Sequence, residues 1–373
     1  MNSDRLRLSW IDAIRGYAAI AVVIYHLWEI NSRFLHFEAG TTLQRVLEFF
    51  IRDGLDIGKI GVVMFFAVSG FVIPYSLLKT KEFNLLKFVS SRFFRLYPLY
   101  WLSIILALVV MGTKFGGFQI AANATMFQSF IGVEDMLGVY WTLQIELIFY
   151  ILCALYFLLG IIQKSKSILL NMYFWLIASL MLAAARYVTE INLPVALTLA
   201  LSVMFFGMAW RKLKQNEGTI QVRSVYIWMA SFALFMFPIS YLAYADEWLQ
   251  YAMSYIVALV IFLAFSKASQ KEFKISSYFG KISYSVYLLH PVIALPMFNA
   301  IMKTAWGQSL GLYGVIILCL VAVVIASSIT FRFIEQPCVD YGRKVTNKLI
   351  DQFTRRRKRG IKTDPSEAPS TII

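Results

Sequence analysis

The sequence predicts an all-α integral membrane protein with about ten transmembrane helices. The first observation is composition: 59% of the 373 residues are hydrophobic, the mean hydropathy is +0.67, and only 15% are charged. One globular core cannot bury that much apolar surface, so a lipid bilayer must act as the solvent. The second observation is that the charged residues fall mostly between long apolar runs, which is typical of membrane spans separated by short loops.

The individual helices are predicted by apolar runs of about 18 to 23 residues, enough to cross a hydrocarbon core about 30 Å thick. The first run follows Asp12 and Arg15 and continues without a small-residue cleavage site, which indicates a retained helix rather than a signal peptide. The runs are centred near Val22, Phe66, Ile105, Phe149, Ala178, Met204, Ala233, Val257, Ile293 and Val321.

The basic residues predict the orientation of the chain. With the N-terminus inside, 28 of the 35 Lys and Arg residues fall on the cytoplasmic side and 7 outside. Because Lys and Arg are retained on the cytoplasmic side, both termini are predicted to be cytoplasmic, and segments 31–57 and 114–137 are the longest outer loops. The net charge of +14 therefore indicates contact with membrane lipids and not with nucleic acid.

Two regions are expected, a membrane domain over 1–345 and a basic cytosolic tail over 346–373. The tail contains the run RRRKR at Arg355 to Arg359, followed by a Pro-, Ser- and Thr-rich end without periodicity. Such a segment is expected to be disordered and held near anionic lipid headgroups by its basic run.

Common soluble-enzyme motifs are absent from the sequence. It contains no HExxH, GxSxG, Walker loop or paired-cysteine metal motif. Of the three cysteines, Cys153 and Cys319 lie inside apolar runs and are expected to pack as small hydrophobic residues. The hydrolase, nucleotide and zinc interpretations therefore lack support, and no metal is expected.

Ionisable side chains inside spans are the first candidates for chemistry, because each costs about 3 kcal/mol on insertion scales. Arg15 and His26 lie eleven residues apart, about three helical turns, so they share nearly one face roughly 16 Å apart along the axis. That face links the cytosolic surface to the membrane interior. His26 is either functional or a neutral histidine hydrogen-bonded between helices.

Glu146 is the second candidate, in the segment GVYWTLQIELIFY. Tyr140 and Trp141 precede it where an outer aromatic belt is expected, so Glu146 lies one to two turns deeper and approaches the depth of His26. A carboxylate beside an imidazole orients the ring and raises its basicity, as a general base for a hydroxyl requires. The alternative is an ion pair with Arg186.

Three further basic side chains leave two interpretations each. His290 precedes Pro291, so its helix is expected to bend, and the ring makes either a substrate contact or a structural bond at the kink. Arg92 and Arg95 share a helical face at the cytosolic mouth, as positive-inside anchors or as a phosphate clamp.

Small residues recur in the second apolar run, GKIGVVMFFAVSGF. Gly58, Gly61 and the pair Ser69 and Gly70 indicate close helix approach or room for a ligand, with helix packing the favoured interpretation.

Together these segments resemble the acyltransferase 3 family of membrane proteins. The segment LSWIDAIRGYAAIAVVIYH is similar to the first helix of that family, in which a basic residue, ten spacer residues and a histidine match Arg15 and His26. The resemblance continues in order through GVVMFFAVSGFVI, RFFRLYPLYW, YWTLQIELIFY, ISYSVYLLHP and FRFIEQP.

The resemblance implies a ten-helix enzyme of the bacterial inner membrane. It would take an acyl group, acetyl by default, from a coenzyme A thioester on the cytosolic side and pass it to a hydroxyl of a cell-surface glycan or its lipid-linked precursor. Some relatives carry an extra C-terminal hydrolase-like domain, which is not expected here.

The resemblance also implies roles for the candidate residues. His26 would be the catalytic base and Glu146 its partner or an acceptor-binding carboxylate, while the donor phosphates would be held by Arg15, Arg92 and Arg95. The remaining candidates for substrate contacts are Ser69, Tyr140, Trp141 and His290, with Ser69, Tyr140 or a backbone amide as the oxyanion donor.

A transporter or flippase of a lipid-linked glycan is the competing class. In it, His26, Glu146 and His290 would form a proton relay. Such proteins are expected to show broken half-helices in matched positions of two halves, which the sequence lacks.

Overall fold

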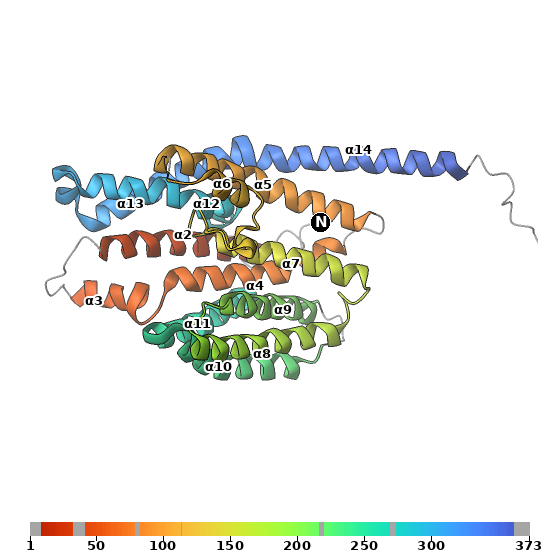
Figure 1. Cartoon of the computed structure of the whole chain (residues 1–373), viewed down its shortest axis with the longest axis horizontal. Coiled ribbons are helices and arrows are strands. Elements are labelled where there is room, and N and C mark those ends of the chain that lie inside the picture. Colours follow the sequence, from red (N-terminus) through yellow and green to blue (C-terminus); the bar gives the residue numbers. More distant parts are fainter. Residues whose placement is uncertain are drawn as a thin grey trace, which may run out of the picture.

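The computed structural model describes residues 9–32, 42–78, 83–112, 114–215, 220–268 and 274–361. All regular structure in these ranges is helical, with no strand, which confirms the predicted all-α fold class. The long helices lie side by side with their axes roughly parallel, as expected for spans that cross one bilayer (Figure 1). Part of the predicted outer loop 31–57, residues 33–41, lies outside the described residues.

Ten long helices contain the ten predicted apolar centres, one centre in each. Among the described residues, nine segments are long and apolar enough to cross a membrane, and two of these, 222–267 and 305–355, contain two long helices each. The chain is therefore a multi-pass membrane protein. The ten helices are α2 (Ser9–Ser32), α4 (Ile57–Leu77), α5 (Asn84–Met111), α7 (Tyr140–Leu158), α8 (Ser165–Thr189), α9 (Val195–Lys214), α10 (Val222–Tyr244), α11 (Trp248–Ala268), α12 (Lys274–Met302) and α13 (Ala305–Thr330).

Three other helices lie outside this set. α3 (Thr42–Glu48) and α6 (Gly117–Ala124) are short and belong to the two predicted outer loops. α14 (Gln336–Ile361) is long and extends well beyond the other helices (Figure 1).

α14 changes the expectation of a disordered tail over 346–373, because the chain is helical as far as Ile361. The helix packs on α5, where the rings of Phe94 and Tyr341 lie 5.9 Å apart and the hydroxyls of Ser90 and Thr346 lie 2.5 Å apart. These contacts anchor its first half, and Lys and Arg are good helix formers, so the basic run continues the helix. Residues 362–373 lie outside the described ranges.

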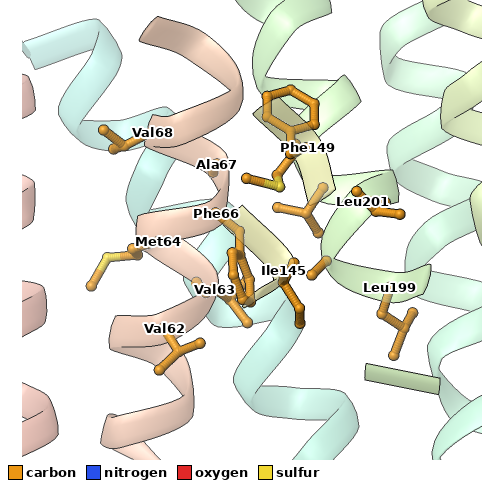
Figure 2. Close-up of a cluster of buried hydrophobic side chains, with 14 of the residues drawn as sticks. Val62, Val63, Met64, Phe66, Ala67, Val68, Ile145, Phe149, Leu199 and Leu201 are labelled. Carbon is orange, nitrogen blue, oxygen red and sulfur yellow. The ribbon is translucent and has the colours of Figure 1, made fainter. Parts of the chain in front are cut away.

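The larger core gathers around α4, which packs against α2, α7, α9 and α11. Figure 2 shows part of it, with Val63 and Phe66 of α4 close to Ile145 of α7, Phe149 one turn farther along α7, and Leu199 on the neighbouring helix α9. A second, smaller core joins α2, α12 and α13. Because α2 and α4 carry residues of both the core and the candidate site, packing fixes the site geometry.

Close approach of α4 and α9 explains two glycines. A Cβ at Gly70 would lie 1.8 Å from the carbonyl oxygen of Met204, and one at Gly207 would lie 2.2 Å from that of Ala67. A Cβ at Gly61 would lie 2.6 Å from the carbonyl oxygen of Ala18 on α2. The packing interpretation of the small residues is confirmed at these positions, since any larger side chain would separate the helices.

Large apolar side chains remain exposed along the outer helices. A water-soluble protein rarely shows contiguous apolar surface of this extent, so these side chains mark lipid-facing surface. On α8, α10 and α13 they include Phe174, Ile177, Met181, Leu234, Phe237, Ile317, Val321, Ile325 and Ile329.

Candidate active site

A cavity of about 100 Å³, here called the arginine cavity, lies between α2, α4, α5, α7 and α12. Five predicted site residues line it: Arg15, Ser69, Arg92, Arg95 and Glu146. They come from four helices and are spread over more than 130 positions of the sequence. The structure therefore brings together the residues for which a phosphate-binding role was predicted.

Three guanidinium groups make this cavity cationic. Arg92 Nη2 donates to Ser76 Oγ at 2.8 Å, and its guanidinium lies over the rings of Phe88 and Tyr150 at 5.5 and 5.3 Å. Its Nε is buried and has no hydrogen-bond partner among the described residues. Since planar guanidinium groups pair with phosphate oxygens, a cluster with an unused buried donor fits a phosphorylated ligand.

Glu146 provides the carboxylate of the arginine cavity. Tyr150, one turn along α7, donates its hydroxyl to Glu146 Oε1, and Ser69 Oγ lies 3.5 Å from the same oxygen. Arg15 and Glu146 are electrostatic neighbours. The alternative partner, Arg186, has its guanidinium 5.5 Å above the ring of Tyr244.

A second cavity of about 130 Å³, here called the His26 cavity, lies between α2, α4, α7, α11 and α12. His26 and Trp141 line it, and the imidazole is about a third exposed, at 33%. The ring is therefore accessible to a ligand in this cavity.

Glu29 is the carboxylate beside His26. Its Oε2 lies 3.4 Å from His26 Nδ1, one helical turn away on α2. With the proton on Nδ1 donated to Glu29, the Nε2 lone pair is the available base. The carboxylate beside His26 in the structure is therefore that of Glu29 and not, as expected, that of Glu146. Trp141 faces the His26 cavity, and Glu146, five residues farther along α7, faces the arginine cavity.

Sequence reasoning missed Glu29, although the i, i+3 spacing from His26 was a usable signal.

His290 forms the bond expected at a proline kink. Its Nδ1 lies 2.7 Å from the carbonyl oxygen of Tyr287, the carbonyl that Pro291, lacking an N–H, leaves without its helical partner. The fully buried ring stacks on His26, with centroids 5.3 Å apart and planes 22° apart. This geometry matches the structural alternative and places the ring directly behind the imidazole of His26.

Val62 and Tyr287 border both cavities and form the wall between them. The Tyr287 hydroxyl lies 2.8 Å from Thr142 Oγ1, and its ring meets Phe65 edge-on at 5.7 Å. One layer of side chains thus separates the arginines from His26. This wall could not be found from sequence, because its residues come from two helices that are far apart in the chain, α4 and α12.

Tyr140 and Trp141 diverge although they are adjacent. Trp141 lines the His26 cavity, whereas Tyr140 is fully buried, bonded to Ser103 at 2.8 Å and packed on Tyr100 at 4.6 Å. Successive helix residues point about 100° apart, which explains the difference. Of the predicted oxyanion donors, Ser69 lines the arginine cavity, and Tyr140 lines neither cavity.

The outer loop 114–137 is tied to α7 through Asp135. Its Oδ1 accepts hydrogen bonds from Gln128 Nε2 at 2.6 Å and from Gln144 Nε2 at 2.9 Å. Burial raises the pKa of Asp135, and the two amide hydrogen bonds act in the opposite direction. These bonds hold the loop where Gly138 borders the His26 cavity.

Across the described residues, no group of three or more His, Cys, Asp or Glu side chains is placed to hold a metal ion.

Known proteins resemble this chain over most of its length. OatA, an O-acetyltransferase of Staphylococcus aureus strain MRSA252, is 26% identical over 395 residues, covering 93% of this chain and 60% of OatA. OatA of strain NCTC 8325 is also 26% identical, covering 90% of this chain and 58% of OatA. ORF330 of Acidianus two-tailed virus is 26% identical over 300 residues, or 75% of this chain and 81% of ORF330.

This chain spans about 60% of the length of the OatA proteins it matches. No solved structure matches it. A family model described as an acyltransferase domain matches residues 8–331. Because that match covers most of the chain and includes the helices that carry both cavities, the chain belongs to the acyltransferase 3 family.

Proposed function

We propose that this protein is an O-acyltransferase that moves an acyl group, acetyl by default, from coenzyme A to a hydroxyl of a cell-surface glycan or its lipid-linked precursor. The family and the names of its relatives support the reaction class. The observation that carries the proposal is the shared wall: Val62 and Tyr287 place a cationic cavity directly beside an accessible histidine.

The arginine cavity binds the donor in this proposal. The nucleotide of coenzyme A carries several negative charges, which Arg15, Arg92 and Arg95 neutralise through charge-assisted hydrogen bonds. The thin pantetheine arm then passes the wall toward His26. Arg15 and His26 lie on one helix about 16 Å apart, a distance that such an arm spans.

His26 acts as the general base. Its Nε2 accepts the proton of the acceptor hydroxyl, whose oxygen attacks the thioester carbonyl. The tetrahedral intermediate collapses, the carbon–sulfur bond breaks, and the coenzyme A thiolate takes the proton back from the imidazolium. The products are the acyl ester and coenzyme A. Glu29, beside Nδ1, stabilises the imidazolium while it exists.

The proposed location is the bacterial inner membrane, with both termini in the cytoplasm. The bias of Lys and Arg toward the loops assigned to the cytoplasm supports this orientation. Coenzyme A would reach the arginine cavity from the cytosol, and the acceptor would reach the His26 cavity from outside.

The test is acyl transfer from radiolabelled acetyl-CoA by purified protein carrying His26→Ala. We expect turnover to fall about 100-fold or more, the contribution of a general base, with binding of coenzyme A retained. Ser309→Ala is the control, since Ser309 is exposed and bonds only within its own helix, to the carbonyl oxygen of Trp306. Near-normal turnover of His26→Ala would show that His26 is not the general base. Failure of the wild type to bind coenzyme A at micromolar levels would favour the transporter alternative.

A further inference from the structure

The His26 cavity contains a charged pair that the proposed chemistry does not use. Asp56 is 5% exposed, and Lys59 lies in the span Ile57–Leu77. Asp56 Oδ2 lies 3.3 Å from Lys59 Nζ, and both residues line the cavity beside His26. A charge within a span is costly, so a pair kept on a cavity wall indicates a ligand.

Asp56 is held by two hydrogen bonds, one accepted by its carboxylate and one donated by its backbone. Its Oδ1 caps α4 by accepting from the backbone N–H of Lys59 at 2.7 Å. Its own backbone N–H donates to Ser254 Oγ of α11 at 2.9 Å, and Ser254 is fully buried. The pair is therefore preorganised, and ligand binding does not have to order it.

Aromatic rings complete the wall around this pair. The ammonium of Lys59 lies 3.6 Å from the centroid of Tyr251, which stacks on Tyr244 at 3.5 Å and on Tyr255 at 5.3 Å. Tyr25 of α2 also borders the cavity. Its ring packs against Gly58 of α4, which has no side chain to displace it. Rings supply apolar faces, and the ion pair supplies hydrogen-bonding groups beside them.

The cavity also has open space at one edge. A Cβ at Gly138 would meet nothing within 4 Å, and Gly138 borders the cavity between the outer loop and α7. Gly138 is exposed, so a larger side chain at this edge of the cavity can be accommodated without displacing a packed neighbour.

We propose that the Asp56–Lys59 pair and Trp141, which lines the same cavity and is 36% exposed, form the acceptor subsite and bind an uncharged sugar ring. This inference rests on the proposed acyl transfer and names the class of acceptor. An ion pair offers both an acceptor and donors to sugar hydroxyls, and an aromatic face packs against the apolar face of the ring.

The charges of this region select against an anionic acceptor. Among the Asp, Glu, Lys and Arg side chains that line the His26 cavity, the charge of Lys59 is already matched by Asp56. A uronic acid or phosphate would therefore find no unmatched ammonium or guanidinium group on this wall. The three guanidinium groups of the arginine cavity direct anionic groups there instead.

The test measures binding of two oligosaccharides of equal length to the purified full chain without donor. Chitotetraose is neutral, and the hyaluronan tetrasaccharide carries carboxylates. We expect chitotetraose to bind at millimolar concentration or tighter and hyaluronan to bind at least about tenfold more weakly. With labelled acetyl-CoA added, chitotetraose should also accept the label.

Two variants separate the subsite from general damage. Gly138→Trp, which fills the open edge, and Trp141→Ala, which removes the exposed aromatic face, should each weaken chitotetraose binding about tenfold and leave coenzyme A binding unchanged. Gly116→Trp is the matched control, because Gly116 is equally open but lies away from both cavities. It should bind like the wild type.

The inference is overturned if chitotetraose does not bind, if hyaluronan binds as tightly, or if Gly138→Trp behaves like Gly116→Trp. These outcomes are independent of the proposed function. That function fails instead if the wild type does not bind coenzyme A or does not transfer its acyl group.

Discussion

The arginine cavity and the His26 cavity are adjacent, share α2 and α4 as walls, and differ in chemistry. The first has three guanidinium groups and the carboxylate of Glu146. The second has a histidine, one ion pair and a wall of aromatic rings. The difference shows that one helix bundle can hold two chemically unlike environments only a few turns apart, because one layer of side chains keeps them separate.

The largest expected effect comes from removing a charge on the donor side. Arg15→Gln should raise the KM for acetyl-CoA about 100-fold, because a buried charge-assisted contact to phosphate is lost, and leave the KM for the acceptor unchanged. Steady-state kinetics with each substrate varied in turn would measure this. Arg332→Gln, at an exposed arginine, is the control. An equal change in both KM values would mean that the cavities are not separate.

A smaller effect is expected when α4, the helix that carries Val62 of the wall, is displaced. Gly70→Ala would force α4 away from α9 and should cost about 2 kcal/mol of stability by overpacking. Since α4 lines both cavities, both KM values should rise together, unlike the result for Arg15→Gln. Thermal unfolding in detergent measures the first effect. Gly117→Ala, where a Cβ meets nothing within 4 Å, should change neither quantity.

Glu29 and Glu146, one carboxylate at each cavity, should affect different kinetic parameters. Glu29→Gln should lower kcat about tenfold with donor binding unchanged, because the imidazolium loses its charged partner. Glu146→Gln should instead alter coenzyme A affinity, since this carboxylate faces the arginines. Asp340→Asn, at an exposed pair with Arg343, is the control. If Glu146→Gln changed kcat alone, the originally predicted pairing with His26 would regain support.

The smallest effect concerns the loop beside the His26 cavity. The pKa of Asp135 is raised in the folded state above its ordinary value of 3.8, so the folded chain binds this proton more tightly. Its contribution to stability is therefore greatest at low pH and falls as pH rises from about 4 through the folded pKa. Melting temperatures between pH 4 and 7 should fall less steeply for Asp135→Asn than for the wild type.

Helical periodicity and apolar length were sufficient to predict the all-α fold class. The apolar runs predicted the ten long apolar helices but not α14, and the spacing of Arg15 and His26 predicted that one helix connects two depths. Glu29 was detectable from its spacing to His26. The helix α14 was not predictable, because tertiary contacts with α5 stabilise it.

The subsite around Asp56 and Lys59 shows what sequence could not supply. Asp56 and Ser254 are 198 positions apart, and only the packing of α11 on α4 brings Tyr251 over the ammonium. Likewise, the orientation that separates Tyr140 from Trp141 depends on where α7 meets its neighbours. Contacts between particular helices depend on how the bundle is arranged. Composition and periodicity do not determine that arrangement.

Because a single helix carries both Arg15 and His26, α2 acts in the proposed reaction as a molecular ruler for the donor. Its length between these side chains is set by covalent geometry and backbone hydrogen bonds and does not adapt to a shorter thioester. A small acylated thiol without its nucleotide would reach the imidazole but have nothing to hold its far end. Insertion of one residue between the two positions would turn His26 about 100° out of register with the arginines.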